Sequence, residues 1–244
     1  MSYYDSGDRR TSYGIGAPPS VSAQIDAGLR AHMQRVYSYM AGGLALTGIV
    51  AYAAATSGFY QAIVATPLIW LIMLAPLGFV LALSFGIRRM STETAMVLFW
   101  IYAAVMGLSL GSIFLVFTGE SIARVFFITA ATYGAMSLYG YTTRSDLSRF
   151  GSFLLMGLIG IVIASLVNIF VGSSALQFAI SIIGVIVFVG LTAYDTQRIK
   201  EMYLESDTAE IAGKKAVMGA LALYLDFINL FMIFLQLFGH RREN

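Results

Sequence analysis

Apolar residues gather in long, separate segments along most of this chain. Seven such segments follow a polar N-terminal stretch, and each is close to the roughly 20 residues that a helix needs to cross about 30 Å of hydrocarbon. Since a backbone in lipid must satisfy its own hydrogen bonds, and the alternation expected of barrel strands is absent, we expect seven transmembrane helices. The predicted spans are residues 36–56, 67–87, 95–117, 122–141, 150–171, 176–194 and 216–238.

The two ends of the chain differ from this apolar middle. Residues 1–30 are rich in serine, glycine and tyrosine and show no apolar periodicity. We therefore expect a disordered cytoplasmic tail at 1–30, a seven-helix transmembrane domain at 31–240 and a polar C-terminal tail at 241–244. Thr66 followed by Pro67 is typical of a capping residue and a proline in the first turn, so we expect the second helix to begin there.

Composition indicates a membrane protein of the all-α class. Hydrophobic residues make up 58% of the 244 residues and charged residues only 11%, which leaves no room for a soluble domain of any size. The net charge of +2 gives no argument for binding nucleic acid. The chain has no cysteine, so disulfides, thiolate metal sites and thiol catalysis are excluded.

Lysine and arginine are distributed unequally between the two sides of the predicted bundle. With a cytoplasmic N-terminus, three of the 15 basic residues, Arg124, Arg241 and Arg242, lie outside and all the others lie inside. This is the bias that the positive-inside rule requires. If the seventh segment re-entered instead of spanning, Arg241 and Arg242 would move inside as well. Its length and uninterrupted apolar character favour a full span.

One charged residue, Asp226, lies near the middle of the apolar segment 216–238. An aspartate at the centre of a spanning helix costs roughly 2.5–3.5 kcal/mol on insertion-derived scales. Such a residue marks a functional site by default. Asp195, directly after the apolar segment 176–194, is the candidate partner. Alone, Asp195 would be an interfacial acid paired with Arg198; beside Asp226, it would complete an acidic pair.

An acidic pair of this kind would respond to pH. Two carboxyl groups in contact in a low-dielectric bundle cannot both ionise at low cost, so the pair would share a proton near neutral pH. Loss of that proton would create repulsion, which favours separation of the helices or capture of Ca²⁺, a hard cation that prefers carboxylate oxygens. Arg88, at the end of the second span, is a candidate counter-charge or a simple topology determinant. Asn229 and Asn168 are candidate accessory groups, or interhelical hydrogen-bonding residues.

The inventory of reactive side chains argues against an enzyme and against a resident cofactor. The two histidines, His32 and His240, lie outside the predicted spans, so a Ser–His dyad or a histidine metal site within the bilayer is excluded. The lysines lie in or beside one loop, which excludes a Schiff base in the middle of the last helix. Two embedded acids are what an aspartyl intramembrane protease needs, but its usual Gly-Asp setting is absent around Asp195 and Asp226.

Two motifs around the acids carry a specific resemblance. Residues 193–200 read AYDTQRIK and residues 222–231 read ALYLDFINLF. This pair resembles the signature of the transmembrane BAX inhibitor motif family, also called the Bax inhibitor-1 family. The likeness to bacterial members extends along nearly the whole membrane part, including residues 107–111 of the third span and 85–89 at the end of the second. The tail at 1–30 is not covered.

The resemblance implies a fold in which the last of seven helices is central and surrounded by the other six. It also implies a pH-sensitive calcium leak across the bacterial inner membrane, with the acid pair at Asp195 and Asp226 and its arginine partner at Arg88. Some relatives carry an acid in the middle of the second helix, where this chain has the apolar residues Pro76 and Leu77. An ion path that needs an acid there is therefore not expected.

Two functional hypotheses follow from the sequence. In the first, the protein passes Ca²⁺ down its gradient and is gated by the proton of the Asp195–Asp226 pair, with Arg88 holding the closed state. In the second, it binds and regulates a membrane-embedded AAA protease or another membrane partner. Bacterial members of the family include such a protease regulator, and a polar tail like residues 1–30 can engage a partner without folding alone.

Overall fold

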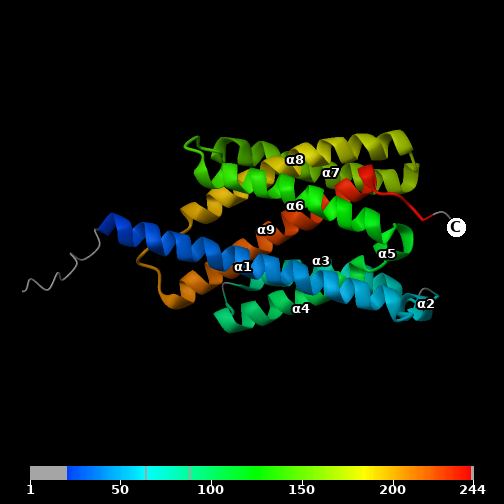
Figure 1. Ribbon diagram of the computed structural model, residues 1–244, viewed down its shortest axis with the longest axis horizontal. Coiled ribbons are helices and arrows are strands. Elements are labelled where there is room, and N and C mark those ends of the chain that lie inside the picture. The colour runs from blue at the N-terminus through cyan, green and yellow to red at the C-terminus, as the bar shows by residue number, and fades with distance from the viewer. Residues whose placement is uncertain (1–20, 64, 88, 243–244) are drawn as a thin grey trace, which may run out of the picture.

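The chain folds into a bundle of helices whose long axes run roughly parallel (Figure 1). The computed structural model describes residues 21–63, 65–87 and 89–242, with side chains from residue 26 onward. Within this part of the chain the elements are α1 (Val21–Thr56), α2 (Phe59–Ile63), α3 (Leu68–Gly86), α4 (Thr92–Leu110), α5 (Ile113–Val116), α6 (Gly119–Thr142), α7 (Ser148–Val171), α8 (Ser174–Glu201) and α9 (Ala209–Phe238).

Seven helical stretches are long and apolar enough to cross a membrane. Six of them are the helices α1, α3, α6, α7, α8 and α9, and the seventh consists of α4 together with the short helix α5. The short helix α2 lies in the connection between α1 and α3. The predicted all-α class with seven spanning helices is therefore confirmed. The last segment is one unbroken helix of 30 residues, so it does not fold back within its apolar stretch.

Helix α1 begins earlier than the apolar pattern predicts. It starts at Val21, so residues 21–30, which the sequence assigned to the tail, are helical, while residues 1–20 lie outside the described part of the chain. The reason is a contact with the α8–α9 loop: His32 is buried and its ring lies 5.8 Å from that of Tyr203. Met33 is buried as well. These contacts stabilise an extra length of helix that the composition alone does not favour.

The start of α3 also differs from the prediction. The helix begins at Leu68, and the Thr66 hydroxyl donates to the carbonyl of Ile63 at 2.8 Å, so it does not cap the helix that follows. Thr66 thus closes the preceding turn. A hydroxyl that bonds backward to a carbonyl three residues earlier cannot accept from the N–H groups of the next helix in the geometry of an N-cap.

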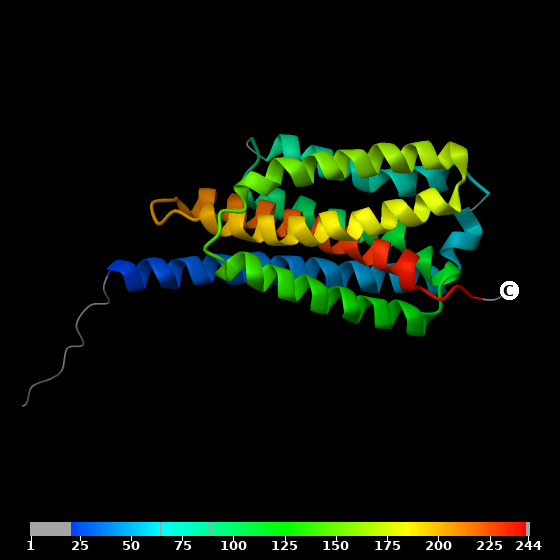
Figure 2. The ribbon, with the colours of Figure 1, turned by 90° about the horizontal axis from the view of Figure 1, so that it is seen from above.

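Helix α9 is the most buried of the spanning helices. Within its most apolar window 67% of the residues are buried, against at most 39% in the others. Helices α1, α4, α6 and α8 pack extensively along α9, while α3 packs on α4 and α7 packs on α8. Figure 2 shows α9 between a layer with α1 and α6 and a layer with α3 and α7. The last helix thus has four close neighbours, and α3 and α7 lie outside them.

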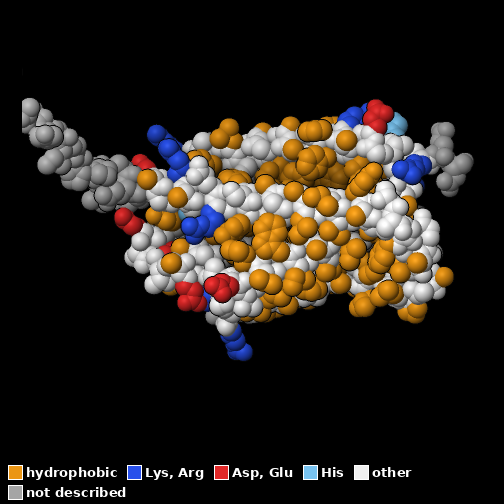
Figure 3. Space-filling view, turned by 60° about the horizontal axis from the view of Figure 1, so that its bottom comes forward, with side chains coloured by type: hydrophobic (Ala, Val, Ile, Leu, Met, Phe, Trp, Pro, Cys, Tyr) orange, Lys and Arg blue, Asp and Glu red, His pale blue; other side chains and the backbone are white. Residues whose placement is uncertain are grey.

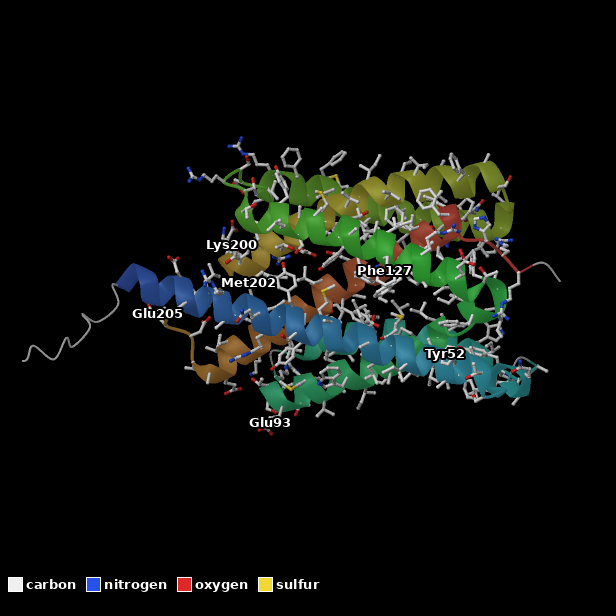
Figure 4. The ribbon with its side chains drawn as sticks, in the orientation of Figure 1. Tyr52, Glu93, Phe127, Lys200, Met202 and Glu205 are labelled. Atoms are coloured by element: carbon white, nitrogen blue, oxygen red, sulfur yellow. The ribbon has the colours of Figure 1, made fainter. Side chains whose placement is uncertain are left out.

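Large apolar side chains cover the sides of the bundle. Phe85 of α3 is 81% exposed and Phe170 of α7 is 89% exposed. Figure 3 shows a broad band of apolar side chains between two ends that carry the charged residues. Glu93, Lys200 and Glu205 lie at the end where α1 begins (Figure 4). An apolar surface this extensive is typical of a protein that faces lipid, so the chain is a multi-pass membrane protein.

Close packing joins α1 to α4 and α9. A Cβ atom on Gly107 of α4 would lie 2.7 Å from the carbonyl oxygen of Thr47 in α1, so only glycine allows the two backbones to approach this closely. The Thr47 hydroxyl donates to the carbonyl of Ala103 at 2.8 Å and lies 2.6 Å from the Tyr224 hydroxyl of α9. Because the single Thr47 proton is already donated, Tyr224 is the donor in the second bond.

The described C-terminal residues fold back onto the bundle. The backbone N–H of Thr118 donates to the carbonyl of His240 at 3.1 Å, and the N–H of Arg242 donates to the carbonyl of Val116 at 2.9 Å. This short antiparallel bridge attaches the first residues of the predicted polar tail to the α5–α6 connection. Residues 243 and 244 lie outside the described part.

Candidate functional site

The two acids singled out in the sequence meet between α8 and α9. Asp195 lies within α8, about two turns before its end at Glu201, because the helix continues beyond the apolar segment. Asp226 lies in the middle of α9. Their side chains line the same cavity and lie close enough for the two carboxyl groups to interact directly. An ionised carboxyl group can only accept, so a hydrogen bond between them requires one member of the pair to carry a proton and donate it.

The two acids of the pair differ in how deeply they are buried. Asp226 is 5% exposed, and its Oδ2 atom has no hydrogen-bond partner among the described residues. Asp195 is half-buried and feels the positive charge of the exposed Arg198. The buried hydroxyl of Tyr133 from α6 lies within electrostatic range of both acids. Protonation of this pair therefore changes the charge at a site where few groups can compensate.

A cavity of about 410 Å³ lies beside the pair, between α7, α8 and α9. It is large enough for several water molecules. Its polar lining includes both acids, Arg198 and Asn229. The other residues that line it are Gly151, Ser152, Leu155, Leu158, Phe188, Leu191, Tyr194, Ala222 and Leu225. The cavity gives an ion or a proton a place to reach the carboxyl groups within an otherwise apolar wall.

Hydroxyl groups link three helices next to the pair. The Tyr37 hydroxyl of α1 is hydrogen-bonded to Ser137 of α6, and Ser137 Oγ lies 3.0 Å from Thr196 Oγ1, the residue after Asp195. Ser137 and Thr196 are 4% and 0% exposed. This chain of hydroxyls fixes the turn of α8 that carries Asp195 against α1 and α6.

The remaining predicted site residues divide into three cases. Arg88 lies outside the described residues, so its role stays a prediction. Asn229 lines the cavity with both acids, although its amide nitrogen donates to the carbonyl of Leu225 at 2.8 Å. Asn168 does not join the pair. It lies near the other end of α7, where its amide nitrogen donates to Gln177 Oε1 at 3.1 Å. Of the two alternatives predicted for Asn168, this is the interhelical hydrogen bond.

The described residues around the acids supply few ligands for a metal ion such as Ca²⁺. Two carboxyl groups and the Asn229 amide oxygen supply oxygen ligands, whereas Ca²⁺ takes six to eight. Across the described residues, no group of three or more His, Asp or Glu side chains is placed to hold a metal ion. Water in the cavity would have to complete the coordination.

Three glutamines that join neighbouring elements were not predicted from the sequence. Gln197 accepts from the N–H of Leu147 at 2.8 Å and donates to the carbonyl of Ser145 at 2.9 Å, which ties the α6–α7 loop to α8. Gln177 donates to Gln236 Oε1 at 2.8 Å, at the end of the bundle opposite the acids. The signal for Gln236 was that it is one of the few polar residues in the apolar segment 216–238.

Comparison with known proteins assigns the chain to a family. A family model described as "Inhibitor of apoptosis-promoting Bax1" matches residues 29–243. The inner membrane protein YbhL of Escherichia coli (strain K12) is 51% identical over 223 residues, which cover 90% of this chain and 95% of that protein.

Two further relatives come from other bacteria. Uncharacterized protein RP147 of Rickettsia prowazekii is 49% identical over 225 residues, which cover 92% of this chain and 95% of that protein. An uncharacterized protein of Caulobacter vibrioides is 46% identical over 231 residues, which cover 90% and 92% of the two chains. The chain is therefore a multi-pass inner-membrane protein and belongs to the Bax inhibitor-1 family.

Proposed function

We propose that the protein is a calcium leak in the inner membrane, gated by the proton that Asp195 and Asp226 share. The observation that supports this proposal best is the placement of the two carboxyl groups together beside one cavity in the membrane part of the bundle. Ca²⁺ is the transported ion, and no resident cofactor is involved. The N-terminus is cytoplasmic, in keeping with the excess of lysine and arginine on that side.

The closed state in this proposal is the pair with one shared proton. The carboxylate of the ionised member pairs with Arg88. The carboxyl group of the protonated member donates its hydrogen bond to that carboxylate. Removing the proton places two negative charges in contact, which at about 4 Å and an effective dielectric constant of about 20 repel by roughly 4 kcal/mol. An average interhelical hydrogen bond in a membrane contributes only about 0.6 kcal/mol. The repulsion is therefore large enough to shift α8 relative to α9.

A second proton also changes the pair. It neutralises the ionised member, and Arg88 then loses the charge that it binds in the closed state. Either change in proton number disrupts the same contact, so the pair acts as a pH-dependent latch between the last two helices. The opened pair, together with Asn229 and cavity water, offers a passing Ca²⁺ its oxygen ligands.

Calcium flux into liposomes tests this proposal. The wild type is expected to pass Ca²⁺ at a rate that depends on pH, and Asp226→Asn is expected to change that dependence because Asp195 then titrates without a carboxyl partner to share its proton. Asp146→Asn, an acid of the exposed α6–α7 loop, is the matched control and should behave like the wild type. A variant at Asp226 with unchanged flux and an unchanged pH profile would rule out the gate.

A second candidate function is the regulation of a membrane-embedded AAA protease or another membrane partner. The first turns of α1 extend beyond most of the bundle, which leaves this part of α1 open to a partner (Figure 1). Deleting residues 2–20 leaves the described part of α1 intact. Loss of a co-purifying protease from the deletion variant would support this function, and equal recovery of the same proteins from both forms would contradict it.

A further inference from the structure

Three facing pairs of residues run along the contact between α8 and α9. Asp195 faces Asp226, Gly184 faces Ile233, and Gln177 faces Gln236. The three α9 residues lie seven and three positions apart, which keeps them on one face of the helix. We call these six residues the α8–α9 seam. The seam begins at the acid cavity and continues toward the opposite end of the bundle.

The far end of the seam is polar. Gln177 Nε2 donates to Gln236 Oε1 at 2.8 Å, and the Ser181 hydroxyl, which donates to the backbone carbonyl of Gln177 at 2.9 Å, lies 3.4 Å from the same Gln236 oxygen. Asn168 of α7 adds its amide at 3.1 Å from Gln177 Oε1. Gln177 and Gln236 are both exposed. Amide groups of this kind are rare in a lipid-facing helix and cost less where water reaches them.

The seam covers part of the apolar thickness of a membrane. Gln177 and Asp195 are 18 residues apart in α8, or roughly 27 Å at about 1.5 Å per residue, whereas Asp226 and Gln236 are ten residues apart in α9, or roughly 15 Å. The hydrocarbon core is about 30 Å thick. The acid pair therefore lies within the bilayer and the amide cluster lies nearer to one of its faces, and the middle of the seam lacks polar side chains.

Ile233 fills that middle. A Cβ atom built on Gly184 would lie 2.7 Å from Ile233 Cδ1, so the isoleucine side chain rests directly on the backbone of α8. Gly184 is buried and Ile233 is half-buried. An apolar constriction between two wetted ends blocks ions because the ion cannot keep its water there.

We infer that the α8–α9 seam is the route by which the cation crosses the bundle, and that Ile233 packed on Gly184 is the constriction that closes it. The inference rests on the proposed leak and adds its path. A divalent cation would pass from the carboxylate oxygens of the acid pair to the amide oxygens of Gln177 and Gln236, both of which are hard ligands. Because the acid pair joins the same two helices, its opening also moves Ile233 away from Gly184.

Single cysteines test the route directly, since the chain has none of its own. The Asn229→Cys and Gln236→Cys variants are expected to react with a membrane-impermeant thiol reagent, each from a different side of a proteoliposome. The Ile233→Cys variant is expected to react only at a pH where calcium flux is high. Ile186→Cys, on α8 and 65% exposed to lipid, is the unreactive control. Labelling at Asn229 and Gln236 no greater than at Ile186 would overturn the route.

Calcium flux tests the constriction. Ile233→Ala is expected to raise the flux several-fold at the pH where the wild type is closed, whereas Ile186→Ala leaves it unchanged. Ile233→Leu keeps the side-chain volume, so the route should remain closed in this variant. It provides the second measurement if the alanine variant folds poorly. Normal wild-type flux with no effect of Ile233→Ala contradicts the constriction and leaves the leak intact. No wild-type flux at any pH contradicts the leak and, with it, the route.

Discussion

Gly140 of α6 lies against the carbonyl group of Ala193 in α8, two residues before Asp195. A Cβ atom built on Gly140 would overlap the carbonyl oxygen and would lie 2.9 Å from both the carbonyl carbon and the Cα atom of Ala193. These are backbone atoms, which cannot turn aside as the end of a side chain can. The contact therefore sets how closely α6 approaches the turn of α8 that carries the acid.

Gly140→Ala is predicted to destabilise the bundle by about 1–3 kcal/mol, the range for an added methyl group in a well-packed interior. The matched control is Gly134→Ala in the same helix, where a Cβ would have open space around it. That change should be neutral or stabilising by up to about 1 kcal/mol, since alanine is the better helix former. Thermal unfolding in detergent measures both. Equal midpoints for the two variants would contradict the close contact between α6 and α8.

Tyr224→Phe is predicted to lower the stability by about 0.6 kcal/mol, and by no more than about 1.7 kcal/mol, because it removes one interhelical hydrogen bond to Thr47. Tyr224 is fully buried, so water cannot replace its partner. Tyr52→Phe, on an exposed part of α1, is the control and should have no measurable effect. In a Thr47→Val background the effect of Tyr224→Phe should shrink, and a full effect there would show that the two hydroxyls are not coupled.

Asp146 gives a pH-dependent prediction outside the spans. Hydrogen bonds from the backbone and side chain of Ser148 hold the pKa of the Asp146 carboxyl below its ordinary value. Because the folded-state pKa is the lower one, this carboxylate stabilises the fold above its unfolded-state pKa, and the contribution is lost as the pH falls through the folded-state pKa. Asp146→Ala should thus lower the unfolding midpoint at neutral pH but not in strong acid.

The control for this prediction is Glu205→Ala, at an exposed acid of the α8–α9 loop. The acid pair titrates in all three proteins, so its effect cancels in the comparison with the wild type. A deficit of Asp146→Ala that stays constant from neutral pH to strong acid would contradict the hydrogen bonds assigned to its carboxylate.

The fold followed from the sequence because spanning helices are apolar along their whole length. The contact between Asp195 and Asp226 was suggested only by a similar depth, since the pattern ended the sixth span at Tyr194. In the structure α8 continues to Glu201, which brings Asp195 inside the helix. The charged and polar residues at 195–201 concealed this extension, because they lie beside loops and other helices rather than lipid.

Neutral polar side chains were harder to place than charges. Asn168 and Asn229 looked alike in the sequence, yet only Asn229 lines the acid cavity. Which of them faces the acids depends on the rotation of α7 and α9, and an apolar helix with no polar face does not define its rotation. Gln177 and Gln236 meet across 59 positions of sequence, a pairing that only the packing of α8 on α9 decides.

The acid pair can be observed through its shared proton. A protonated carboxyl group has a carbonyl stretching band in the infrared that a carboxylate lacks, and the double variant Asp195→Asn/Asp226→Asn removes the contribution of the pair. The most direct test is to record this band and the calcium flux of the same proteoliposomes across one pH series. We predict that the part of the band lost in this double variant changes with the same midpoint as the wild-type flux, and that the flux of the double variant does not change with pH. A flux that changes while the band stays constant would contradict the gate.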